Sequence, residues 1–195
     1  MLEEAYDAIG GELGVFPRDR MQVGIYATRV FGDLIGAPPH LIAGAYDGRK
    51  IRLNLTASAA YSQSLSRLVR HEYTHALIHL ATNGRAPLWL HEGLAQVMEP
   101  RRAPRFLEVS VPREYLTLSG IERLARTASP EALVDGYSLT HVAVEHLVER
   151  GGMTGMRAFL QRLGQGEATA QALRGAFGFG PEDVEGRLLA AAGRS

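Results

Sequence analysis

The sequence predicts an α+β fold with a small N-terminal antiparallel sheet and a mainly helical remainder. Strand-like runs fall within residues 1–56, where apolar and polar residues alternate around an Asp-Gly pair. Residues 57–195 instead place apolar side chains at three- and four-residue spacing between Gly and Pro breakers, which is typical of helices. A length of 195 residues and a hydrophobic content of 46% suit a single globular domain over 1–195.

The N-terminal part alternates between the two periodicities. The expected elements are a helix over 2–14, a strand over 21–27, a short helix over 28–35, and two strands over 42–46 and 49–55. Asp47-Gly48 joins the last two strands. This dipeptide favours a tight hairpin because both turn positions need a positive φ. The resulting sheet edge near Ile51–Leu55 comes just before the chemically most informative helix.

Helical spacing dominates after residue 57. Helices are expected over about 62–82, 88–99, from a capping box at 119–122, from Pro130, and over 137–150, 153–163, 167–177 and 181–192. Gly151-Gly152 is expected to separate two of these helices. Residues 101–113 are rich in Arg and Pro and are expected to form a surface loop.

Composition excludes several classes of protein. Lys plus Arg and Asp plus Glu both number 21, and this balance argues against a general nucleic-acid binder. The absence of Cys excludes disulfides, thiol catalysis and Cys-ligated metal sites. No apolar run approaches the roughly 20 residues of a membrane span, and no leader segment is recognisable, so the cellular location stays unassigned.

The sequence His71-Glu72-Tyr73-Thr74-His75 carries the chemistry. Two His four residues apart lie on one face of a helix, where both imidazoles can bind a single Zn²⁺. Glu72 lies beside that face, within reach of a metal-bound water, and is the candidate general base. The alternative is a buried helix whose His side chains are merely hydrogen-bonded.

The third metal ligand comes from further along the chain. A third His at the metzincin spacing is missing, since that position holds Ala81. Glu92 follows His75 after sixteen residues, enough to end one helix at Asn83-Gly84 and return antiparallel in a second. His71, His75 and Glu92 would then leave the fourth position of a tetrahedral zinc site open for water.

These residues resemble the gluzincin metallopeptidases, specifically the peptidase-MA-like domains related to the M1 aminopeptidases. The shared pattern is H-E-x-x-H followed by W-L-x-E-G-x-A, which spans 71–75 and 89–95 here. The resemblance implies a zincin-like fold, zinc held by His71, His75 and Glu92, and Glu72 as the base. The segment Gly44–Gly48 lacks the Glu with which M1 enzymes hold a substrate's amino group, which argues against an aminopeptidase.

Three further residues are candidates for contacts with substrate. Tyr137 opens an expected helix, and the resemblance implies that a downstream Tyr or His stabilises the oxyanion. His141 lies one turn later on the same face and is the alternative for this role. His91 precedes Glu92 and is a candidate for lining the cleft.

The remaining site candidates are weaker. Glu99 lies two turns beyond Glu92 and is a reserve third ligand. His79 continues the four-residue series but lies too far along the helix to share the ion, and His146 falls on another face from His141.

The sequence therefore predicts a zinc metallopeptidase that hydrolyses a peptide or protein substrate. Two alternatives remain open: a peptide-binding module that keeps the site without turnover, and a self-restrained enzyme whose Arg- and Pro-rich loop covers the cleft. The substrate, the cleavage preference and the oligomeric state are not predicted.

Overall fold

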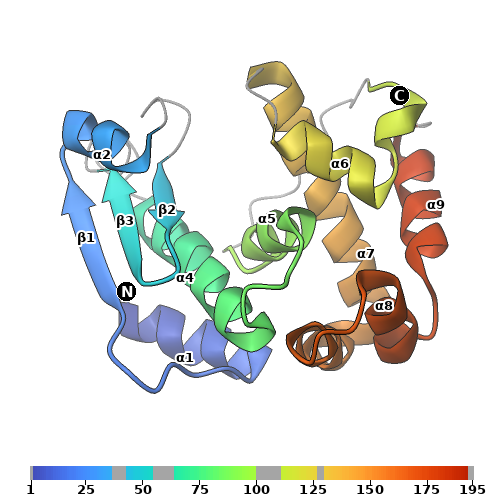
Figure 1. Cartoon of the computed structure of the whole chain (residues 1–195), viewed down its shortest axis with the longest axis horizontal. Helices are drawn as coiled ribbons and strands as arrows, with labels where there is room; N and C mark the ends of the chain where they lie inside the picture. Colours follow the sequence, from blue (N-terminus) through green and yellow to red (C-terminus); the bar gives the residue numbers. More distant parts are fainter. Residues whose placement is uncertain (1, 37–42, 55–63, 100–110, 127–129, 193–195) are drawn as a thin grey trace.

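The computed structural model describes the chain except residues 1, 37–42, 55–63, 100–110, 127–129 and 193–195. It confirms the predicted α+β class, with a small sheet near the N-terminus followed by helices (Figure 1). The elements are α1 (Leu2–Leu13), β1 (Gln22–Tyr26), α2 (Thr28–Ile35), β2 (Gly44–Tyr46), β3 (Lys50–Asn54), α4 (Ser64–Thr82), α5 (Leu88–Val97), η1 (Arg113–Tyr115), α6 (Leu118–Ala125), α7 (Pro130–Gly164), α8 (Thr169–Phe177) and α9 (Pro181–Ala192).

The sheet is mixed rather than wholly antiparallel as predicted. Its order is β1-β3-β2; β2 and β3 form the expected antiparallel hairpin, whereas β1 runs parallel to β3. The hairpin forms because Asp47 Oδ1 accepts the backbone N–H groups of Arg49 and Lys50, at 3.0 and 2.9 Å, and Gly48 adopts a φ of 88°. Strand β1 is parallel because the chain returns through α2 before it enters the hairpin.

The predicted open edge at Ile51–Leu55 is wrong. Strand β3 occupies the centre of the sheet, and within the described sheet the edges belong to β1 and β2. Side-chain alternation alone does not reveal which strand lies in the middle, because that depends on where β1 pairs. The sheet edge next to α4 is therefore β2.

Helix α4 is the central element of the fold. It packs against α1, β2 and β3 on one side and against α5 and α7 on the other (Figure 1). Leu77 and Ile78 of α4 are fully buried, together with Ile51 from the sheet and Ile9 from α1. This helix is therefore held between the sheet and the helical part, which fixes the direction of its side chains.

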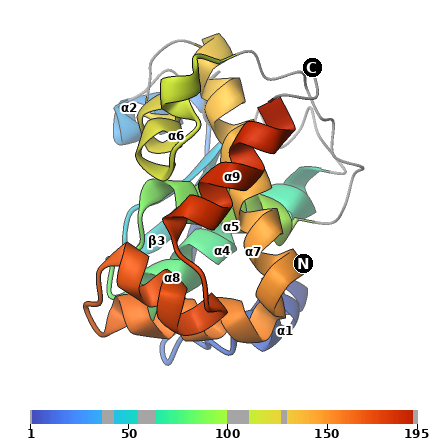
Figure 2. The same cartoon turned by 90° about the vertical axis from the view of Figure 1, so that its right-hand side faces the viewer.

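Helix α7 organises the helical part. Figure 2 shows α9 lying across α7, with α6 and α8 near its opposite ends, and each of these helices contacts α7. The predicted separation of two helices at Gly151-Gly152 is confirmed, because two helical segments of α7 meet at a kink at Gly152, where φ is 60° and ψ is −171°. The helix that begins at Pro130 instead continues without a break into the predicted helix over 137–150. Gly151 also has a packing role, since a Cβ on it would lie 2.5 Å from the Phe177 ring.

The start of α6 also differs from the prediction. Its N-cap is Thr117, whose hydroxyl accepts the Gly120 N–H at 3.0 Å, rather than Ser119. Most of the expected loop at 101–113 lies outside the described residues. In the described part of the chain, none of the helices has both the length and the apolar character needed to cross a bilayer.

The contact between α5 and α7 is unusually close at Gly93. A Cβ on this residue would lie 2.2 Å from the Thr140 carbonyl oxygen and 2.5 Å from Val144 Cγ2. Trp89, one turn earlier on α5, stacks on Phe159 of α7 with ring centroids 6.4 Å apart. The two helices are thus in backbone contact at one point and held by a large aromatic pair beside it.

We expect Gly93→Ala to lower the free energy of unfolding by about 2–3 kcal/mol, because the new methyl group meets backbone that cannot rotate away. The matched control is Gly186→Ala on α9, where a Cβ meets no described atom within 4 Å. That change should raise stability by roughly 0.5–1 kcal/mol through helix propensity. Urea denaturation followed by circular dichroism measures both, and equal effects would contradict the close contact.

Candidate metal centre

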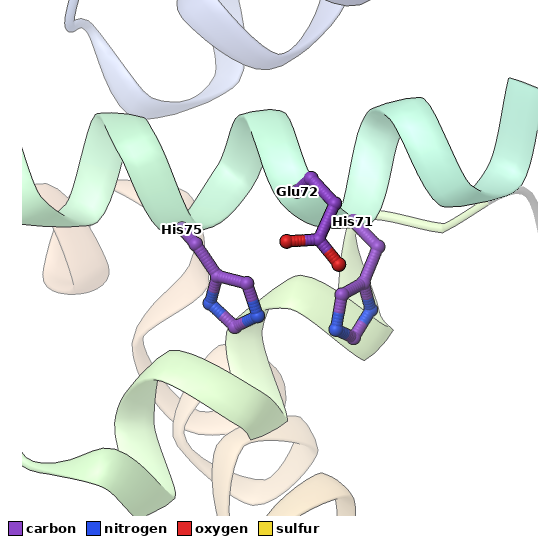
Figure 3. A group of neighbouring side chains, drawn as sticks. All are labelled: His71, Glu72 and His75. Carbon is purple, nitrogen blue, oxygen red and sulfur yellow. The ribbon is translucent and has the colours of Figure 1, made fainter. Parts of the chain in front are cut away.

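The motif residues of α4 come together as their spacing predicts. The imidazole rings of His71 and His75 have centroids 4.7 Å apart and an interplanar angle of 85°. One donor atom from each of His71, Glu72 and His75 lies within 4.8 Å of the others. Figure 3 shows both rings projecting from the same side of α4, with the Glu72 carboxylate between them. The cluster could hold a metal ion.

Helix α5 brings the Glu92 carboxylate to this cluster. Its Oε2 lies 3.6 Å from His71 Nε2 and its Oε1 lies 3.9 Å from His75 Nε2. Two ligands about 2.1 Å from a tetrahedral ion are about 3.4 Å apart. The observed spacings therefore need only small side-chain rotations for the three groups to bind one ion. The chemistry and spacing of the donors fit zinc.

The other nitrogen of His71 is occupied by a second acid. His71 Nδ1 lies 2.8 Å from Glu99 Oε1, and the other carboxylate oxygen of Glu99 accepts Arg67 Nε at 2.9 Å. A carboxylate on Nδ1 places the proton there and leaves Nε2 free to bind metal. Glu99 thus contacts the far side of the ring, which disfavours the reserve-ligand interpretation.

The spacing of Glu92 and Glu99 indicates a shared helix face, but it does not predict that contact. Seven residues cover about two turns, or about 10 Å along the axis. In the structure α5 ends at Val97, and the chain just beyond it brings Glu99 to His71 Nδ1, while Glu92 within α5 faces Nε2.

Glu72 is enclosed. Its side chain is only 4% exposed, and its Oε2 has no hydrogen-bond partner among the described residues. The start of β2 covers it so closely that a Cβ on Gly44 would lie 2.6 Å from Glu72 Oε1. Burial raises the pKa of Glu72 to about 7, against the opposing influence of His71. A carboxyl group with that pKa can gain and lose a proton near neutral pH.

The histidines differ sharply in protonation. Burial lowers the pKa of His71, but the carboxylates of Glu92 and Glu99 outweigh it and raise the value to about 10. Burial lowers the pKa of His75 to about 3 and that of His91 to about 4. Burial also raises the pKa of Glu92, yet the neighbouring His71 and His75 hold it below its usual range. Without metal at neutral pH, His71 is therefore protonated and His75 is neutral.

The proposed substrate-contacting residues lie at different distances from the cluster. The His91 ring centroid is 5.6 Å from that of His75. Burial and then the charges of Glu92 and Glu72 raise the pKa of Tyr137, so its hydroxyl interacts electrostatically with both acids. His141 contacts Glu145 on its own helix at 3.9 Å, and its buried Nδ1 has no hydrogen-bond partner in the described chain. Their roles stay predictions, and Tyr137 has the more direct link to the acids.

The other two histidines have contacts with residues outside the cluster. The His79 ring lies against Tyr46, with centroids 5.7 Å apart, near the hairpin. His146 Nε2 lies 2.7 Å from Asp183 Oδ1, and this pair joins α7 to α9. Both therefore have structural contacts of their own.

Comparisons of the chain with known protein families, with curated proteins and with solved structures give no match. The geometry of the site is therefore the basis for inferring a function.

Metal binding should release a proton. At pH 8 His71 carries a proton, whereas Glu72 has largely lost its own, and only a neutral imidazole binds metal. We expect calorimetric Zn²⁺ titrations in buffers of different ionisation enthalpy to show release of about one proton per ion at pH 8. Affinity should rise with pH up to about 10, since deprotonation of His71 favours binding. Pure ion pairing without metal binding would give no such titration.

The same experiment tests Glu99. We expect Glu99→Gln to weaken Zn²⁺ binding by about 10- to 100-fold and to reduce proton release, because His71 loses the carboxylate that orients its ring and holds its proton. Glu182→Gln, in an exposed pair with Arg174, is the matched control and should change neither quantity.

Proposed function

We propose that this protein is a zinc-dependent peptidase of the gluzincin type. The observation that carries the proposal is a buried carboxylate, Glu72, one oxygen of which has no hydrogen-bond partner among the described residues. It lies beside two imidazoles that converge with a second acid. A purely structural cluster would pair that oxygen, because an unsatisfied buried polar group costs about 1–3 kcal/mol. A general base instead needs a free oxygen.

Zinc is the metal that best suits the donors. Two imidazole nitrogens and one carboxylate oxygen form the His₂Glu set of catalytic zinc sites, which leaves one coordination position open. His71 and His75 would bind through Nε2, since both of these atoms face Glu92. Without any Cys in the chain, the softer metals have no thiolate to bind.

The chain's residues supply the proton transfers. A bound zinc ion lowers the pKa of coordinated water and polarises the substrate carbonyl. Glu72 accepts the proton of the attacking water on its free oxygen and then donates it to the leaving amine. Its pKa of about 7 suits both steps, because the protonated and ionised forms are both accessible near neutral pH. Tyr137 donates its hydroxyl proton in a hydrogen bond to the developing oxyanion.

An extended peptide is the substrate class that the surroundings favour. Strand β2 begins at Gly44, directly over Glu72, and has no partner on its outer side within the described sheet. Peptides bind such edges by adding as a further strand. A peptide on β2 would pass its backbone beside the proposed base.

We expect Glu72→Gln to keep zinc and to lose at least about 100-fold in kcat, since the amide has the shape of the acid but cannot accept the proton. Metal analysis with an unbiased peptide-library digest measures both properties. Glu92→Gln is the contrasting variant and should weaken zinc binding. Full zinc occupancy with no cleavage by the parent protein would favour a peptide-binding module, and equal cleavage by the Glu72→Gln variant would refute the base.

We expect Tyr137→Phe to lower kcat by about 10²–10³ with little change in zinc affinity, because one oxyanion donor is removed. His141→Gln, one turn further on α7, should have a much smaller effect. The reverse order of the two effects would assign the oxyanion role to His141.

A further inference from the structure

Gln96 lies one turn beyond Glu92 on α5 and reaches across to α7. Its Nε2 donates to the Tyr137 carbonyl oxygen at 3.0 Å and lies 3.2 Å from Thr140 Oγ1. The carbonyl oxygen of Glu92 is also 3.2 Å away. An amide group carries two hydrogens, so the three oxygens share them. One side chain thus connects the backbone of Glu92 to the backbone of Tyr137.

The α7 end of this connection is itself held in place. Thr140 is fully buried, and its hydroxyl donates to the same Tyr137 carbonyl oxygen at 2.8 Å. The Tyr137 carbonyl therefore receives two side-chain hydrogen bonds, one from its own helix and one from α5. Of these two hydrogen bonds, the one from Gln96 holds α5 and α7 together at Tyr137.

The neighbouring contact at Gly93 does not by itself fix α5 relative to α7. A glycine facing a carbonyl sets how closely α5 and α7 approach, but a bare van der Waals contact resists rotation and sliding only weakly. The hydrogen bonds of Gln96 are directional and resist both motions. Gly93 sets the spacing of the helices, and Gln96 sets their register.

We propose that Gln96 is a positioning residue that fixes Tyr137 relative to Glu92 and Glu72, through the backbone of α7. The inference deepens the proposed peptidase function and rests on it. Among the described contacts, Gln96 reaches the backbone carbonyl of Glu92 but donates to no side chain of the cluster.

The kinetic consequence follows from the distance dependence of catalysis. A misplacement of about 1 Å at a catalytic group can cost about 100-fold in rate. Gln96→Met keeps the length of the side chain and removes its donors. We expect this variant to lose roughly 10- to 100-fold in kcat, with KM and zinc affinity changed by less than about threefold. Gln96→Glu, which keeps the shape and when ionised also lacks the donors, should behave alike.

A double-mutant cycle separates positioning from a general structural role. If Gln96 acts through Tyr137, then Gln96→Met should cost little further activity in a Tyr137→Phe background. Fully additive losses would overturn the proposal. Gln171→Met, at an exposed position on α8, is the matched control and should leave kcat unchanged.

A second readout needs no turnover and no metal. The full chain is labelled with 3-fluorotyrosine, and the Tyr137 signal in the ¹⁹F NMR spectrum is assigned by its loss in Tyr137→Phe. We expect Gln96→Met to shift or broaden that signal, whereas the other six of the seven tyrosines and the Gln171→Met spectrum stay unchanged. An unmoved Tyr137 signal would refute the positioning role. A moved signal in a protein without peptidase activity would retain the coupling and reject the peptidase.

Discussion

The position of α5 between α4 and α7 is the constraint on which the site depends. Glu92 faces the two histidines of α4, and Gly93, the next residue, contacts the Thr140 carbonyl of α7 so closely that no side chain fits. Adjacent residues on a helix point about 100° apart, so one short helix contacts both neighbours through consecutive positions. Any shift of α5 that relieved the glycine contact would also move the carboxylate.

Electrostatics then gives each group of the cluster a distinct state. Glu99 and Glu92 hold a proton on His71, burial keeps His75 neutral, and burial also raises the pKa of Glu72 to about 7. Neighbouring titratable groups with such strongly shifted pKa values, here His71, His75 and Glu72, are typical of functional sites. A dication could take the place of the proton on His71 Nε2 beside Glu92, while Glu99 keeps its contact with Nδ1. The cluster could therefore hold a metal ion.

The metal cluster also illustrates how far spacing along a helix can be used. The interval of four between His71 and His75 follows from helix geometry and needs no knowledge of the rest of the molecule. The contact of Glu99 with His71 depends on the crossing of α4 and α5, which the sequence does not encode in any local pattern. The same holds for Gln96, whose partners on α7 lie 41 and 44 residues away. A polar residue on a helix gives no local signal of what a distant helix will present to it.

Similar limits apply to the fold. Alternation and the Asp-Gly turn were enough to predict the hairpin of β2 and β3, because a hairpin is a local structure. They were not enough to predict that β1 pairs in parallel on the far side of β3, since that pairing is set by the path through α2. Gly151-Gly152 correctly indicated the break between two helical segments of α7, whereas nothing in the local pattern showed that the helix from Pro130 runs on through Tyr137.

The sequence by itself determined the α+β class, the hairpin, and the helix that presents His71, Glu72 and His75 together, because each of these follows from short-range periodicity. The tertiary structure alone decided that Glu92 meets both imidazoles, that Glu99 holds the other side of His71, and that Gln96 joins α5 to α7. The physical reason is that hydrogen bonds and ion pairs between helices depend on crossing angle and register. Those are set by the packing of the whole core, in which no local segment carries the information.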